Sequence, residues 1–183
     1  MPSMKETTVS SRTIYSGRIV QLEVAEVRLE DGRTSTREIV RHGEAAVILA
    51  KLPDGRFVFV RQFRKPMEVD VLEAIAGGRE PGETPEECAR REVAEETGYE
   101  VADIVPLGPL VCSPGYCTEV IHAFLATLAP NPGRQRLDAD ENIDAVLLTR
   151  AQVEDAIADG SLWDGKTLAA WAKMTVREGR SRA

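Results

Sequence analysis

The sequence of 183 residues predicts a mixed α/β (α+β) fold built in layers, and three observations carry this prediction. Alternating apolar and polar residues fill the first part of the chain, a helix with start and stop signals lies at residues 84–98, and two further helical patterns follow residue 150. Apolar strand-like runs separate these helices. This order along the chain, in which strands, one helix, further strands and then helices follow one another, is typical of a fold with helices packed on a sheet.

The front of the chain is expected to form a small antiparallel β-unit. Residues 1–11 are polar and rich in Ser and Thr, and we expect them to fray. Between residues 12 and 41 apolar residues alternate with polar ones, and Asp31-Gly32 is a turn signal between two strand-like runs. We therefore divide the chain into a β-rich segment, 1–43, and a main domain, 44–183.

Short apolar runs are the expected strands of the main domain. A tight turn at residues 53–55 joins the first two runs, and Ala76-Gly77-Gly78 is expected to end the third. Apolar spacing predicts two helices in the tail, one through Val153 and Ile157 and one through Leu168 and Trp171. The expected strands are 45–50, 57–60, 71–72, 104–111, 120–128 and 143–148.

The central helix has the clearest local signals. Thr84 is a suitable N-cap, Pro85 suits the first helical position, and Glu87 stands three residues after the cap, as in a capping box. Gly98 is the expected end of the helix, because glycine adopts the left-handed conformation that closes many helices.

Composition excludes several classes of protein. Hydrophobic residues make up 43% of the chain, which is enough for a core. A net charge of −7 without a basic run disfavours nucleic-acid binding. No apolar stretch approaches the length of a membrane span, and no secretion signal is evident. Three cysteines without metal-ligand spacing indicate reduced thiols and a cytoplasmic location.

Three carboxylates are expected to share one face of the central helix. Glu92, Glu95 and Glu96 are spaced i, i+3 and i+4, so their charges repel one another. A divalent cation would turn this repulsion into binding, because hard cations take clustered oxygen ligands. Taken alone, the spacing is more typical of a solvated acidic face, since Glu is a good helix former. Arg91 is adjacent and is expected to orient a neighbouring carboxylate.

The surrounding pattern, GGREPGETPEECARREVAEETGY at residues 77–99, resembles the Nudix box of the Nudix hydrolases. Tyr99 stands where the family has an aliphatic residue, which is a mild departure at a packing position. The resemblance implies an α/β/α sandwich around a mixed sheet. It also implies hydrolysis of a nucleoside diphosphate linked to another group, with Mg²⁺ or Mn²⁺. The matching residues are Gly77, Glu83, Arg91, Glu92, Val93, Glu95, Glu96 and Gly98.

Four elements outside the box are similar to the ADP-ribose pyrophosphatase and nucleotide-sugar hydrolase branch. They are Arg61–Arg64, Leu72–Gly78, Ser113-Pro114-Gly115 with Glu119, and Asp164–Thr167. This similarity implies cleavage of ADP-ribose to AMP and ribose 5-phosphate, or of a related nucleoside diphosphate sugar. GDP-mannose is an alternative substrate, and a non-catalytic nucleotide-sugar sensor is an alternative function. An RNA-cap hydrolase is disfavoured by the negative charge.

The resemblance also implies roles for individual residues. The carbonyl of Ala76 and the carboxylates of Glu92, Glu96 and Glu141 are expected to bind the metal. Glu95 is expected either to be a further ligand or to support the ligands, and Glu95 and Arg91 are expected to assist catalysis. Glu141 is alternatively the general base, and Asp140 competes with it for that role. The substrate is expected to contact Arg37, Glu38, Arg64, Gly78, Ser113, Pro114, Gly115 and Glu119.

Some of these residues have an equally good structural explanation. Arg37 is as easily a strand-surface charge, and Glu73 is as easily a residue that fixes the loop before the box. In relatives of this branch a β-rich front segment forms an intersubunit sheet and contributes residues to the partner's site. We therefore expect a homodimer formed through residues 1–43.

Overall fold

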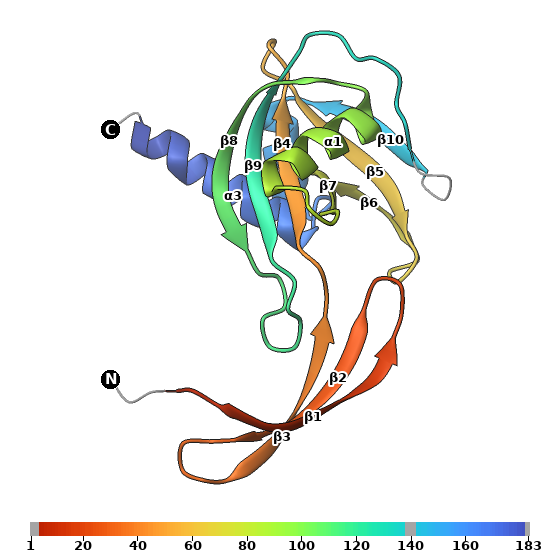
Figure 1. The fold of residues 1–183 in the computed structure, drawn as a ribbon. Helices are drawn as coiled ribbons and strands as arrows, with labels where there is room; N and C mark the ends of the chain where they lie inside the picture. The colour runs from red at the N-terminus through yellow and green to blue at the C-terminus, as the bar shows by residue number, and fades with distance from the viewer. Residues whose placement is uncertain (1–3, 138–141, 182–183) are drawn as a thin grey trace. The chain divides into compact units, whose positions relative to one another are not determined.

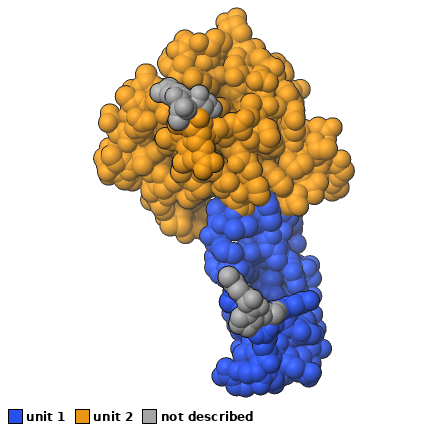
Figure 2. All heavy atoms as spheres, turned by 90° about the vertical axis from the view of Figure 1, so that its left-hand side faces the viewer, with its two compact units in different colours: residues 1–43, 111–120 blue, residues 44–110, 121–183 orange. Residues whose placement is uncertain are grey.

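The computed structural model describes residues 4–137 and 142–181. The chain forms two compact units, coloured separately in Figure 2. The first contains residues 1–43 and 111–120, and the second contains residues 44–110 and 121–183. The loop at 111–120 thus belongs to the same unit as the β-rich front segment, although the two are far apart in the sequence.

The first unit is a three-stranded antiparallel sheet in the order β1-β2-β3. Its strands are β1 (Thr7–Ser16), β2 (Gln21–Arg28) and β3 (Thr34–Arg41). The expectation of fraying is wrong for residues 7–11, which pair with β2 from Thr7 opposite Arg28 onward. All ten side chains of β1 are exposed, so its polar composition reflects solvent contact rather than disorder.

The loop at 111–120 joins this unit through main-chain hydrogen bonds. The Val40 amide donates to the Tyr116 carbonyl at 2.7 Å, and the Thr118 amide donates to the Val40 carbonyl at 3.0 Å. Within the loop, the amides of Tyr116 and Cys117 both donate to the Ser113 carbonyl. These bonds tie the Ser-Pro-Gly turn to β3.

The second unit contains a seven-stranded mixed sheet. The path β10-β5-β4-β9-β8 is extended by β6, which pairs with β5, and by β7, which pairs with β4. Strands β4 and β9 are parallel, and the other pairs are antiparallel. The strands are β4 (Ala45–Lys51), β5 (Phe57–Arg64), β6 (Val69–Glu73), β7 (Ile75–Gly78), β8 (Val101–Leu110), β9 (Ile121–Leu128) and β10 (Ile143–Leu148).

Helices cover both faces of this sheet (Figure 1). Alternate residues of β4 point to opposite faces: Ile48 belongs to the core under α1 (Pro85–Thr97), and Leu49 belongs to the core under α2 (Arg150–Ala158) and α3 (Gly165–Ser181). The predicted α/β/α sandwich is therefore confirmed. No helix among the described residues is long and apolar enough to cross a membrane.

One strand of the site differs from the expectation. Gly77-Gly78 was expected to end a strand, yet both residues lie in β7 and pair with Ala46 and Ala45 of β4. The physical reason lies in helix α1: a side chain at Gly77 would meet the Glu92 carboxylate. Glycine is therefore present at this position for close approach rather than for a turn.

Candidate active site

Helix α1 is fixed at both ends by its own sequence. The Thr84 side chain accepts a hydrogen bond from the Glu87 amide at 3.2 Å, and the Glu87 carboxylate accepts one from the Thr84 amide at 2.7 Å. At the other end Gly98 has a φ of 73° and its amide donates to the Ala94 carbonyl. The predicted capping box and glycine stop are both confirmed, and they set the position of every carboxylate on the helix.

Two of the three predicted carboxylates on α1 are buried. Glu92 is 8% exposed and Glu96 is 4% exposed, whereas Glu95 is only partly buried. Carboxylates are costly to bury unless cations or hydrogen-bond donors face them. The burial of two acidic residues on one helix face argues against a solvated acidic surface.

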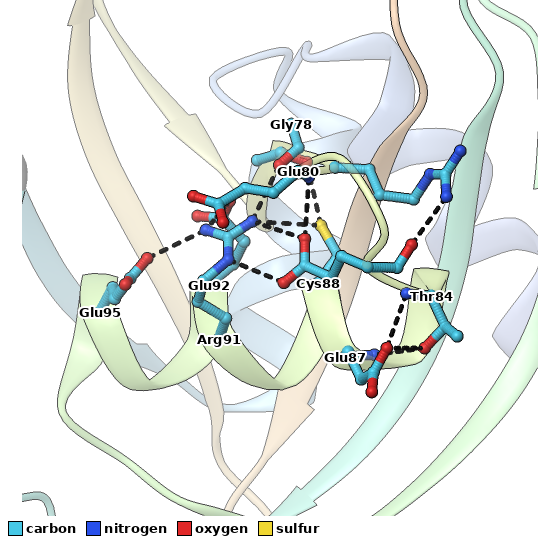
Figure 3. Close-up of polar contacts among 11 residues, drawn as sticks. Gly78, Glu80, Thr84, Glu87, Cys88, Arg91, Glu92 and Glu95 are labelled. Carbon is cyan, nitrogen blue, oxygen red and sulfur yellow. Dashed lines mark hydrogen bonds and ion pairs between the residues drawn. The ribbon is translucent and has the colours of Figure 1, made fainter.

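Arg91 forms ion pairs with three carboxylates of the box (Figure 3). It donates two hydrogen bonds to Glu83, at 2.9 and 3.1 Å, and its Nη1 donates to Glu92 at 2.7 Å and to Glu95 at 3.0 Å. Its Nη2 also donates to the Gly78 carbonyl at 2.9 Å. The hydrogen bonds from Arg91 lower the pKa of Glu83. One guanidinium thus offsets the repulsion among three acidic side chains and ties them to β7.

Gly77 lets Glu92 approach the backbone of β7. A Cβ atom at this position would lie 2.0 Å from the carboxylate carbon of Glu92, which is far inside van der Waals contact. The Glu92 carboxylate therefore lies against the peptide that follows Ala76. This places a buried carboxylate next to the segment whose carbonyl was predicted to bind metal.

The described residues contain part of the predicted metal site. Among them, no group of three or more His, Cys, Asp or Glu side chains is arranged to hold a metal ion. The predicted set, however, combines the two buried side chains Glu92 and Glu96 with a main-chain carbonyl and with Glu141, and both Glu141 and Asp140 lie outside the described residues. Buried carboxylate oxygens and a main-chain carbonyl are the donors that suit a hard divalent cation.

A second ionic cluster lies at the other end of the loop before the box. Glu73 is 1% exposed and accepts hydrogen bonds from Arg64 Nε at 2.5 Å and Arg64 Nη2 at 2.8 Å. Lys166 forms an ion pair with Glu73 and a second one, at 3.0 Å, with Asp164. The hydrogen bond to Glu73 raises the pKa of Arg64. Glu73 thus binds one edge of the Arg64 guanidinium through Nε and Nη2, and among the described residues the Nη1 atom is left for another ligand.

Sequence reasoning missed Lys166 as part of this cluster. The residue lies in the Asp164–Thr167 element, and Glu73 lies 93 residues earlier in the chain. Glu73 and Lys166 can each be identified in the sequence, but no local spacing indicates that they pair.

The remaining predicted substrate residues lie in the first unit. Arg37 forms an ion pair with Glu6 and donates to the Ser35 hydroxyl at 2.9 Å, while Glu38 is exposed on the same strand. Glu119 lies 3.3 Å from the Nδ1 atom of His42. The structure brings these side chains into one unit with the loop that carries Ser113, Pro114 and Gly115.

Two family models together cover most of the chain. Residues 41–171 match the NUDIX domain, and residues 6–40 match the nucleoside diphosphate sugar hydrolase N-terminal domain. The chain belongs to the NUDIX family. The resemblance inferred from the Nudix box is therefore confirmed.

Two of the relatives match nearly the full chain. An ADP-ribose pyrophosphatase of Bacillus subtilis is 36% identical and a methanol dehydrogenase activator of Bacillus methanolicus is 38% identical; the alignments cover 97% and 95% of both chains, respectively. A GDP-mannose pyrophosphatase of Escherichia coli K12 is 38% identical over 72% of this chain and 73% of its own. The crystal structure of an ADP compounds hydrolase matches the whole of both chains, with a TM-score of 0.86 at 23% identity, which supports the fold.

Proposed function

We propose that this NUDIX hydrolase cleaves the pyrophosphate bond of ADP-ribose or a related nucleoside diphosphate sugar, releasing a nucleoside monophosphate and a sugar phosphate. The observation that carries the proposal is the pair of buried carboxylates, Glu92 and Glu96, on a capped helix, with Glu92 lying against Gly77 of β7. Relatives named for the hydrolysis of ADP-ribose and GDP-mannose support the same chemistry.

The metal-binding residues proposed here are the Ala76 carbonyl, Glu92, Glu96 and Glu141, and the cation is Mg²⁺ or Mn²⁺. A bound divalent cation neutralises charge on the pyrophosphate oxygens and makes phosphorus more electrophilic. Glu141, or alternatively Asp140, takes the proton of the attacking water as general base. Arg91 keeps Glu92 and Glu95 in place through its hydrogen bonds.

Arginine side chains are proposed to bind the diphosphate. Arg64 suits this role, because Glu73 holds its Nε and Nη2 atoms while the Nη1 edge remains for a phosphate oxygen. Arg37 and Glu38 are proposed to contact the nucleotide, and Gly78 is proposed as a further substrate-binding residue. Contacts to the distal ribose are assigned to Ser113, Pro114, Gly115 and Glu119.

A substrate panel tests the activity. Release of nucleoside monophosphate from ADP-ribose, GDP-mannose and UDP-glucose is measured with Mg²⁺ and with Mn²⁺. Turnover of at least one of them is expected, and Glu96→Gln should lower its rate by about 10²–10³-fold, because several kcal/mol of charge stabilisation are lost. Folded wild-type protein that binds these compounds without turnover would instead be a nucleotide-sugar sensor.

We also propose that the protein is a cytoplasmic homodimer assembled through residues 1–43. Every side chain of β1 is exposed, including the apolar residues Val9, Ile14 and Tyr15. Exposed apolar side chains along an edge strand are typical of an interaction surface.

A further inference from the structure

The chain changes pairing partner at Ala74. Strand β6 pairs with β5 up to Glu73, and β7 pairs with β4 from Ile75 onward. Ala74 lies between them, is 1% exposed, and donates its amide to the Thr167 hydroxyl at 2.8 Å. A buried amide without an acceptor is destabilising, so Thr167 supplies the bond that neither neighbouring strand supplies.

The Thr167 hydroxyl is held in one orientation. Thr167 is fully buried, and its hydroxyl donates to Asp164 Oδ2 at 2.5 Å. The same carboxylate oxygen accepts the Thr167 amide at 3.0 Å, as an N-cap of α3 does. Because the hydroxyl hydrogen is directed at Asp164, an oxygen lone pair faces the Ala74 amide. The bond to Ala74 is therefore specified by the start of α3.

The crossing at Ala74, where the chain passes from pairing with β5 to pairing with β4, lies close to the peptide next to Glu92. Ala76 is only two residues further on and pairs with Val47 of β4, and Gly77 lies against the Glu92 carboxylate. A shift at the crossing would move the Ala76 carbonyl relative to that carboxylate. Carbonyl and carboxylate can share one cation only when their separation is fixed.

We propose that Thr167, oriented by Asp164, is a positioning residue of the active site: it holds Ala74 so that the Ala76 carbonyl and Glu92 bind the same divalent cation. The proposal rests on the metal-binding role proposed above for Ala76 and Glu92. It extends the site to the tail of the chain, 93 residues beyond the loop that it fixes.

Binding of Mn²⁺ alone, without nucleotide, tests this proposal. Titration calorimetry should show that Thr167→Val, which removes the hydroxyl and keeps the volume, raises the Mn²⁺ dissociation constant about tenfold, the size of effect typical of residues that orient metal ligands. Thr167→Ser retains the hydroxyl and should stay close to wild type. Thr175→Val is the matched control, because the Thr175 hydroxyl on the same helix bonds to the Trp171 carbonyl at 2.9 Å and, among the described residues, to no residue of the sheet.

The outcomes separate this proposal from the proposed activity. If wild type hydrolyses nucleotide sugars and binds Mn²⁺ while Thr167→Val binds Mn²⁺ equally well, the positioning role is wrong and the activity stands. An equal loss of affinity in Thr175→Val also overturns it, because the effect would then come from helix α3 as a whole. If Thr167→Val does not fold, Asp164→Ala, which removes the oxygen that orients the hydroxyl, replaces it, and an unchanged dissociation constant in that variant is equally decisive.

Discussion

Gly77 shows how one missing side chain shapes the site. Its position in β7 requires only an extended backbone, which any residue can adopt, so conformational freedom does not explain the glycine. Space does explain it, because the Glu92 carboxylate occupies the volume that a Cβ atom would need. Since the far end of a flexible side chain is what blocks the Cβ, a substitution should displace Glu92 rather than break the sheet.

Gly77→Ala is therefore expected to impair the active site more than the fold. The hydrolysis rate should fall at least about tenfold, because residues displaced from metal-binding geometry lose about 10–100-fold in metal affinity. The melting temperature should fall by only a few degrees, in line with the roughly 1 kcal/mol of an ordinary point mutation. Gly179→Ala on α3, where nothing lies within 4 Å, is the control and should keep full activity. A Gly77→Ala protein with wild-type rate would contradict the close approach.

The residue scale also shows what the sequence could and could not predict of the site. Arg91 was expected to orient a neighbouring carboxylate, and it binds Glu92 and Glu95, which are one and four residues away on the same helix. Contacts of that range follow from helical spacing. The pairing of Glu73 with Lys166 spans 93 residues, and only the folded chain brings them together.

At the scale of elements, α1 depends on contacts between residues close in the sequence, whereas the strands depend on contacts between distant residues. The boundaries of α1 were predictable because the capping bonds of Thr84 and the left-handed Gly98 involve residues at most four positions apart. Residues 7–11 of β1 were expected to fray, and the glycines of β7 were expected to end a strand. Whether these strands form depends on partners in β2 and β4, and local composition does not specify such pairing.

The reactivity of the Cys88 thiol shows whether α1 stays packed on the sheet. The side chain is fully buried, and burial is the main cause that raises the pKa of the thiol to about 12. Only the thiolate reacts with iodoacetamide, and a pKa of 12 leaves about one thiolate in a thousand at pH 9. Between pH 7 and 9 we expect exposed Cys112 to be alkylated first, with Cys88 modified only after unfolding in guanidinium. Mass spectrometry of the peptides measures this, and equal labelling of both thiols in the folded protein would disprove the packing.

At the scale of the whole molecule, the family match extends through both parts of the chain. The NUDIX domain match begins at residue 41, directly after the separate match to an N-terminal domain that ends at residue 40. The structure shows why the two parts differ in composition. The second unit buries two apolar cores against its helices, while most of the side chains of the three-stranded sheet face solvent. A three-stranded sheet that buries so little of its own surface is only marginally stable unless another protein surface packs against it.

Dimer formation would cover this sheet, and the exposed apolar residues of its edge strand β1 offer the test. Light scattering at micromolar concentration should give twice the chain mass of 20.1 kDa for wild type. Ile14→Lys places a charge among the exposed apolar residues of β1 and should shift the protein toward the monomer, because burying an unpaired charge costs several kcal/mol. Val176→Lys, at an exposed apolar position on α3, is the control and should leave the mass unchanged. A monomeric wild type would rule out the dimer, and an unchanged mass for Ile14→Lys would place the interface away from β1.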